Sequence, residues 1–173
     1  IFKRCCEELG TDAAAKLGDA VMRFGFRQAT LSGVSLGKDT VKRYAGYEAA
    51  LAKAWQGVER LEEHWAIVDH WARATEQMAR SAMKELAADQ GGLNPVYMMA
   101  TSGARGSQAQ IRQLTVMRGL MAVPDDRILS VPVTGNFVHG LSPFEHLSSI
   151  FGARKGLSDT ALKSADAGFL FKR

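Results

Sequence analysis

The spacing of apolar and polar residues divides the first forty residues into two stretches of different character. Residues 2–24 repeat apolar positions at helical intervals, which predicts a short helix or a pair of helices interrupted at Gly10 and Thr11. Residues 25–40 contain spaced glycines and alternate between apolar and polar positions. This second pattern is typical of a strand or an extended loop.

The next fifty residues predict a helical hairpin. From Asp39 to Ala88 the sequence is rich in Ala, Glu, Lys and Arg and contains no proline, as expected for two helices. We expect them to join near Gln56 and Gly57, and such a short connection folds helices into an antiparallel pair. Aromatic residues at near-helical spacing favour a buried seam over a ligand-binding box. They are Tyr44, Tyr47, Trp55, Trp65 and Trp71.

A turn-rich break at residues 89–95 separates the hairpin from a further helix. Ser107 and Gln110 form an S-x-x-Q capping box, so a helix should begin there and run to Met121. Its apolar face would consist of Ile111, Leu114, Met117 and Met121. Residues 127–137 alternate and contain β-branched residues, which predicts an extended segment.

The last thirty residues predict one long helix with an unusual stripe of small residues. Ser142, Pro143 and Glu145 give a strong start signal: a capping serine, proline at the first helical position and glutamate at the third. Each interior glycine costs about 1 kcal/mol relative to alanine. The stripe therefore needs a reason: either another helix or a flat, charged ligand such as a nucleic-acid duplex approaches closely. Its members are Gly152, Gly156, Thr160, Ser164 and Gly168.

Composition and charge agree with a mainly α fold with short extended segments. The chain has 173 residues, 46% of them hydrophobic, and no apolar run of membrane-spanning length. We expect a cytosolic protein, and because the first residue is Ile1, a piece of a longer chain. The net charge of +4 arises from residues 97–173, which hold nine basic and five acidic residues. This excess favours an anionic partner or, equally, a solvated basic surface.

Candidate chemistry in the residues themselves is sparse. SGARGS (residues 102–107) suits a tight turn that presents Arg105 better than a phosphate loop, because it lacks G-x-x-x-x-G-K-[ST]. The four histidines match no metal-binding spacing, so no metal site is expected. Cys5 and Cys6 are expected to be buried thiols in a reducing compartment. Nothing here forms a complete active site.

Longer motifs carry a resemblance to a known family. FGARKGLSDTALKSADAGFLFKR (151–173) resembles the bridge helix of the largest subunit, beta-prime, of bacterial RNA polymerase. NPVYMMATSGARGSQAQIRQLTVMRGLMA (94–122) and VPVTGNFVHGL (131–141) resemble the segment before that helix. FRQATLSGVSLGKD (26–39) is moderately similar to the stretch that leads into the funnel of this subunit. In residues 41–92 only the hairpin pattern and Trp71 match.

The resemblance implies an internal fragment of a large multidomain subunit with three parts. Residues 1–40 would end a pore-type domain, and residues 41–135 would form a funnel domain whose rim helices surround the secondary channel for nucleoside triphosphates. Residues 136–173 would begin the cleft domain with the bridge helix, which positions the template and takes part in translocation. The family commonly has a basic–acidic pair where this sequence has Val138 and His139.

Site residues follow from the same resemblance. Residues near the nucleic acid and the active centre would be Arg154, Lys155, Thr160, Lys163, Ser164, Ala165 and Gly168. Residues that form and support the channel wall would be Arg105, Gln110, Arg112, Gln113 and Arg118. No catalytic residue is expected in this chain, because the aspartates that hold Mg²⁺ would precede Ile1 and the trigger loop would follow Arg173.

The resemblance also implies partners, and a second interpretation of the function stays open. The partners would be template DNA, the RNA–DNA hybrid, nucleoside triphosphates, the beta, alpha, omega and sigma subunits, and regulatory factors of the secondary channel. Location would be the bacterial cytoplasm at the nucleoid, without membrane contact. The alternative is a stand-alone helical protein derived from polymerase that binds other proteins or nucleic acid without catalysis.

Overall fold

The structure is a computed structural model that describes residues 1–123, 125 and 127–172, except the side chain of Lys38. Arg173, the predicted last residue of the final helix, lies outside this part. The chain forms two compact units, residues 1–36 and residues 37–173. Helices predominate in both, as the sequence predicts, and none of the described helices is both long and apolar enough to cross a bilayer.

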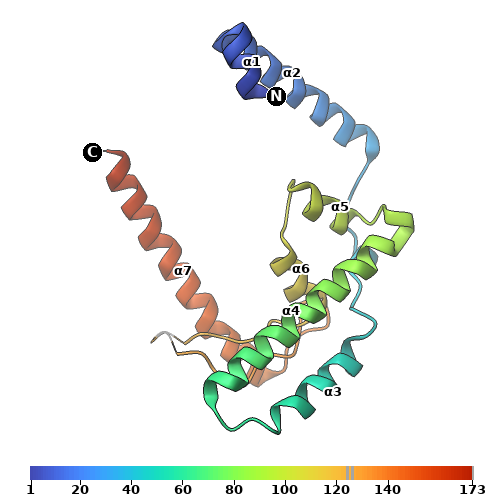
Figure 1. The fold of residues 1–173 in the computed structure, drawn as a ribbon, viewed down its shortest axis with the longest axis vertical. Coiled ribbons are helices and arrows are strands. Elements are labelled where there is room, and N and C mark those ends of the chain that lie inside the picture. Colours follow the sequence, from blue (N-terminus) through green and yellow to red (C-terminus); the bar gives the residue numbers. More distant parts are fainter. Residues whose placement is uncertain (124, 126, 173) are drawn as a thin grey trace. The chain divides into compact units, whose positions relative to one another are not determined.

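The first unit consists of helices α1 (Phe2–Leu9) and α2 (Thr11–Ser32), which pack against each other (Figure 1). The predicted break is confirmed at Gly10, whose φ of 86° suits glycine. The predicted strand or extended loop over residues 25–40 is wrong for residues 25–32, because α2 continues to Ser32 and ends at Gly33 in the left-handed conformation. Arg, Gln, Ala and Leu in this stretch are good helix formers, and no proline interrupts them. Residues 34–37 form a loop, as the second alternative predicts.

Neither helix of the first unit contains a buried residue. The expectation of buried thiols is therefore wrong: Cys6 is exposed and Cys5 is half-buried. A pair of helices alone has too little surface in common to enclose a side chain fully, which explains this outcome.

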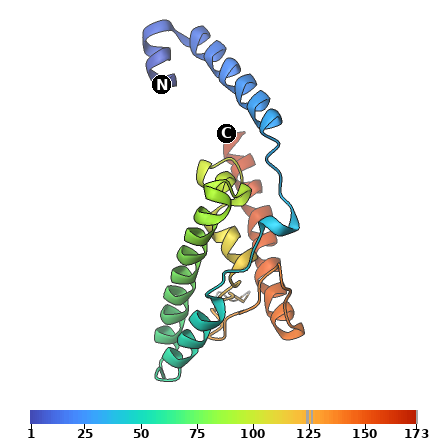
Figure 2. The ribbon, with the colours of Figure 1, turned by 90° about the vertical axis from the view of Figure 1, so that its right-hand side faces the viewer.

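The second unit is built around the predicted hairpin, α3 (Tyr47–Val58) and α4 (His64–Ala88), seen edge-on in Figure 2. The connection lies at residues 59–63, later than the predicted junction, and Gly57 lies within α3. Trp71 is completely buried between the helices and meets Trp55 edge to face, with ring centroids 4.8 Å apart. The hydrophobic cluster around it contains Tyr47, Met78, Ala82, Val116 and Met117. Trp65, in contrast, is 70% exposed and not part of the seam.

Two short helices follow the hairpin after the 3-10 turn η2 (Asp89–Gly92). Helix α5 (Pro95–Ser102) was not foreseen, although Asn94 caps it by accepting hydrogen bonds from the amides of residues 96 and 97. Helix α6 (Gln108–Thr115) begins as predicted, with Ser107 accepting from the amide of Gln110. It ends six residues before the predicted Met121.

Helix α6 ends early because the backbone groups of the residues that follow it form hydrogen bonds in an irregular antiparallel ladder. Gly119 and Val133 exchange both hydrogen bonds at 2.9 Å, and the Leu129 amide donates to the Met121 carbonyl. The prediction of an extended segment at residues 127–137 is confirmed for its described residues. Gly119 adopts a φ of 85°, which the turn into this ladder requires.

The ladder leads into α7 (Pro143–Phe171), the predicted long helix, of 29 residues. At ~1.5 Å per residue it is about 43 Å long. Its predicted start is confirmed in detail, with Ser142 as the cap, Pro143 at the first position and a reciprocal capping box with Glu145. Every described residue from Thr160 onwards is exposed.

Candidate nucleic-acid interface and its supporting wall

The first turn of α7 is fixed by the carboxylate of Glu145. One oxygen accepts from the Thr134 hydroxyl at 2.9 Å and from the Gly135 amide at 2.8 Å. The other accepts from the amide and hydroxyl of Ser142 at 3.0 and 2.9 Å. Burial opposes ionisation of this group, but the four donors outweigh it and lower the pKa of Glu145 to about 2. The helix is thus anchored through an ionised cap.

A small cavity of about 300 Å³ lies where α7 faces α6 and the ladder. Three of the predicted wall residues line it: Arg112, Gln113 and Arg118. From α7 it is lined by Lys155, which was predicted as an interface residue, and by Gly152, Gly156 and Asp159. The cavity therefore brings the predicted wall against the base of the predicted interface, with three cations and one carboxylate around it.

Arg118 is held in the wall by two side-chain contacts. Its guanidinium lies over the ring of Phe137, 4.8 Å from the centroid, and its Nε donates to Gln113 at 3.3 Å. Burial lowers the pKa of Arg118 from its usual value, yet arginine remains protonated at neutral pH. The side chain can therefore act as a fixed positive charge in the wall.

The other two predicted wall residues lie elsewhere. Arg105 and Gln110 are both exposed and do not line the cavity. The amide of Arg105 donates to the carbonyl of Met99 at 3.2 Å, which confirms that the SGARGS segment forms a tight turn. The structure thus separates the exposed turn and helix start from the wall next to α7.

The small-residue stripe divides into a packed part and an open part. At Gly152 a Cβ atom would lie 3.3 Å from the sulfur of Met121, so glycine allows α7 to approach the ladder closely. At Gly156 and Gly168 no heavy atom of the described residues lies within 4 Å of such a Cβ. Packing among these residues therefore accounts for the first glycine and not for the other two.

The exposed part of α7 carries short polar side chains as well as exposed apolar ones such as Leu157 and Leu162. The Thr160 hydroxyl donates to the carbonyl of Gly156 and the Ser164 hydroxyl to that of Thr160, both at 2.8 Å. Because these hydroxyls bond back to their own helix, they do not project as side-chain donors. The remaining predicted interface residues are exposed as well: Arg154, Lys163, Ala165 and Gly168.

Asn136 holds the turn that contains Val138 and His139, where the related family commonly has a basic–acidic pair. It is buried, donates to the Val116 carbonyl at 3.1 Å and accepts from the amide of His139 at 2.9 Å. The His139 ring lies against the same amide oxygen, with Nδ1 at 3.2 Å. His139 is thus folded onto the turn, while Val138 is 42% exposed.

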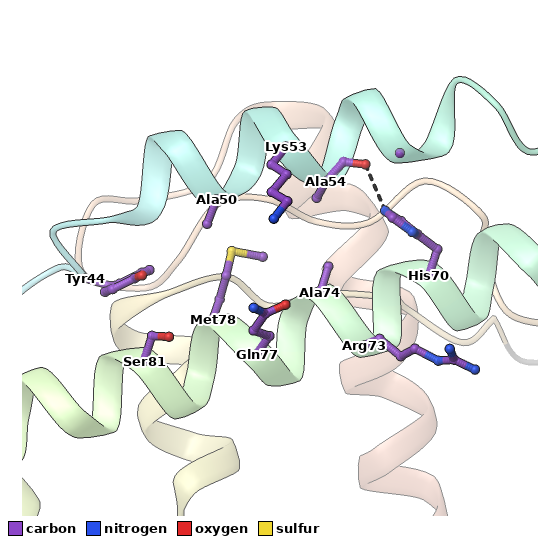
Figure 3. Close-up of a pocket in the computed structure, with 11 residues that line it drawn as sticks. Tyr44, Ala50, Lys53, Ala54, His70, Arg73, Ala74, Gln77, Met78 and Ser81 are labelled. Carbon is purple, nitrogen blue, oxygen red and sulfur yellow. Dashed lines mark hydrogen bonds between the residues drawn. The ribbon is translucent and has the colours of Figure 1, made fainter.

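A second cavity of about 380 Å³ lies between α3 and α4 (Figure 3). His70 closes one end, with Nε2 2.9 Å from the Ala54 carbonyl. A Cβ atom on Gly57 would overlap the His70 ring, so the glycine within α3 is required by helix packing. In the described part of the chain, no group of three or more His, Cys, Asp or Glu side chains could hold a metal ion.

Comparison with known proteins shows the family to which this chain belongs. The sequence matches the family described as RNA polymerase Rpb1, domain 4, over residues 58–148. It is 41% identical to the DNA-directed RNA polymerase subunit beta' of Nitrosococcus oceani over 98% of this chain, and 42% identical to that of Alcanivorax borkumensis over 100%. The identity to the subunit of Moorella thermoacetica is 40%, again over 100% of this chain. The chain belongs to the bacterial RNA polymerase beta' subunit family.

The coverage of the relatives is small. The chain spans 14% of the first two proteins and 16% of the third. The matches extend over 185 to 197 residues, whereas this chain has 173, so each alignment includes at least 12 positions without a counterpart here.

Two residues of the site were missed from the sequence. Thr134 and Tyr47 lie far apart in the chain, yet the Tyr47 hydroxyl donates to the Thr134 carbonyl at 2.6 Å. Burial raises the pKa of Tyr47, which keeps the hydroxyl protonated as a donor. The S-x-x-E motif predicted the cap by Glu145, but no local pattern signals a contact across 87 residues.

Proposed function

We propose that this segment of an RNA polymerase beta' subunit lines the secondary channel through which nucleoside triphosphates enter, and supplies the bridge helix beside the active centre. In this role α3 and α4 are the rim hairpin, and α7 is the bridge helix, which positions the template and takes part in translocation during DNA-templated RNA synthesis. The observation that carries the proposal is the open glycine at position 168, together with Gly156, on a helix of 29 residues.

The physical reasoning concerns what these glycines cost. Each lowers helix propensity by about 1 kcal/mol relative to alanine, and in the described part of the chain no heavy atom lies within 4 Å of the position that a Cβ atom would take. A base pair that approaches the backbone closely uses this space. The exposed basic residues Arg154 and Lys163 flank this surface and suit the phosphates of a nucleic acid.

Roles follow for the other residues of the site. Thr160, Ser164 and Ala165 would face the nucleic acid with short side chains, and Lys155 would join the wall formed by Arg112, Gln113 and Arg118. Arg105 and Gln110 would lie along the channel. The boundaries at residues 40 and 135 belong to the same proposal.

The rest of the enzyme completes the chemistry. Mg²⁺ would be held by carboxylates outside this segment and would stabilise the attacking and leaving oxygens in nucleotidyl transfer. The partners would be template DNA, the RNA–DNA hybrid, nucleoside triphosphates, the beta, alpha, omega and sigma subunits, and factors that bind in the secondary channel.

The experiment is to replace Gly156 or Gly168 by leucine in the intact subunit, assembled into polymerase. Among residues 1–123, 125 and 127–172, no heavy atom lies within 4 Å of either new Cβ, and each leucine should raise helix propensity. In the enzyme, however, it should displace the base pair. We expect elongation to slow about tenfold or more, because a displacement of about 1 Å at a reacting centre can cost a factor of about 100.

Ser158→Leu is the matched control for Gly156→Leu, because Ser158 is exposed and lies about 200° around the helix from Gly156. It should leave elongation close to the unmodified rate. Unchanged elongation in both glycine variants, with normal assembly of the enzyme, would overturn the assignment of α7.

A further inference from the structure

One peptide group connects the hairpin to the start of α7. The carbonyl of Thr134 accepts a hydrogen bond from the Tyr47 hydroxyl at 2.6 Å. The N–H of the same peptide, on Gly135, donates to the Glu145 carboxylate at 2.8 Å. The peptide therefore has the first residue of α3 on one side and the first turn of α7 on the other.

The position of the Tyr47 hydroxyl is set by the hairpin. The side chain is only 3% exposed and belongs to the cluster that surrounds Trp71. The guanidinium of Arg43 covers its ring, 4.1 Å from the centroid, and pairs with Glu48 at 2.9 Å. A shift of α3 relative to the ladder must therefore move the hydroxyl with it.

The other side of the peptide controls how α7 begins. The Glu145 oxygen that accepts from Gly135 also accepts from the Thr134 hydroxyl, while its second oxygen holds Ser142. A planar peptide cannot turn its carbonyl without turning its N–H. In addition, a hydrogen bond accepted by the carbonyl polarises the N–H and strengthens the bond that it donates.

We propose that the Thr134–Gly135 peptide couples the rim hairpin to the N-terminal turn of α7, with Tyr47 as the positioning residue. This inference rests on the proposed function of α7 and adds a route by which a factor that binds the hairpin acts on the bridge helix. Loss of the Tyr47 hydroxyl loosens the first turn and lowers the fraction of enzyme whose α7 is ready for the incoming nucleotide.

The test uses Tyr47→Phe in the complete, assembled polymerase, because phenylalanine removes the hydroxyl and keeps the buried ring. A smaller competent fraction raises the apparent KM for nucleoside triphosphate and leaves kcat at saturation nearly unchanged. We expect KM to rise about two- to tenfold, the range that corresponds to the loss of one hydrogen bond. Glu145→Gln should raise it in the same way.

The double variant distinguishes coupling from two independent defects. If both residues act through one peptide, the KM of the double variant should fall below the product of the two single fold-changes, because the second change removes little that remains. Tyr97→Phe combined with Glu145→Gln is the matched control: Tyr97 lies in α5, and its fold-change should multiply with that of Glu145→Gln. If Glu145→Gln prevents assembly, Thr134→Val replaces it, since valine lacks only the hydroxyl that binds Glu145.

Three outcomes would overturn the coupling: no change of KM in Tyr47→Phe, equal losses in kcat and kcat/KM, or full multiplication of the two effects. Parallel measurement of Gly156→Leu separates the two proposals. If Gly156→Leu slows elongation while Tyr47→Phe leaves KM unchanged, the coupling is overturned and the proposed function stands. Normal elongation in both Gly156→Leu and Gly168→Leu removes the proposed function on which the coupling rests.

Discussion

Replacing Gly57 by alanine should destabilise the hairpin, even though alanine is the better helix former. The exchange gains about 1 kcal/mol of helix propensity. Against this, the new methyl group overlaps the His70 ring, which packs directly on the Gly57 backbone. Overpacking of this kind costs about 1–3 kcal/mol, and displacement of the ring from the Ala54 carbonyl removes a hydrogen bond worth about 1 kcal/mol. The expected net loss is about 1–3 kcal/mol.

The measurement is urea unfolding of the chain followed by tryptophan fluorescence, because Trp71 is completely buried in the hairpin seam and becomes exposed on unfolding. The decisive comparison repeats the exchange in a His70→Ala background. Without the imidazole the overlap is gone, so Gly57→Ala should now stabilise the chain by about 1 kcal/mol. A stabilising effect in both backgrounds would refute the packing of His70 on Gly57.

Two further predictions concern caps. The free energy of unfolding should fall by about 1–2 kcal/mol between pH 4.5 and about 2, after allowance for solvent screening, because the pKa of Glu145 is lowered to about 2 in the folded chain. Glu145→Gln should remove this part of the pH dependence. An unchanged pH profile in that variant would contradict the cap. Asn94→Ala should lower the free energy of unfolding by about 2–3 kcal/mol in the same urea assay. The buried side-chain amide of Asn94 caps α5 and also donates to the Thr40 carbonyl and to Asp89. A loss below about 0.5 kcal/mol would show that these bonds do not stabilise the chain.

The sequence predicted those features that depend on neighbouring residues. The start of α7 could be predicted because serine, proline and glutamate act within one turn. The same applies to the break at Gly10 and to the cap of Ser107. Helix α5 was missed for a local reason: Asn94 and Pro95 were interpreted only as the end of a turn, although the same pair begins a helix when the asparagine side chain binds the following amides.

Features that depend on distant residues could not be predicted. The end of α6 at Thr115 depends on the pairing of Gly119 with Val133, which competes with helix formation only after the chain has folded back. The position of Gly57 within α3 depends on His70 in the next helix. Of the predicted wall, the three residues next to the ladder gather at α7, whereas Arg105 and Gln110 belong to the exposed turn and helix start before it. The roles assigned to the interface residues stay predictions.

The anchoring of α7 at one end has a mechanical consequence. The helix is held at its cap and by the contact of Gly152 with Met121, while all described residues from Thr160 onwards are exposed. The part of α7 beyond Gly152, about 29 Å long, amplifies angle into distance: a tilt of about 7° displaces its far end by about 3.5 Å. That displacement is close to the ~3.4 Å between successive nucleotides of one strand. If α7 is the bridge helix proposed above, a small rotation at its base therefore suffices to move its tip by about one nucleotide step.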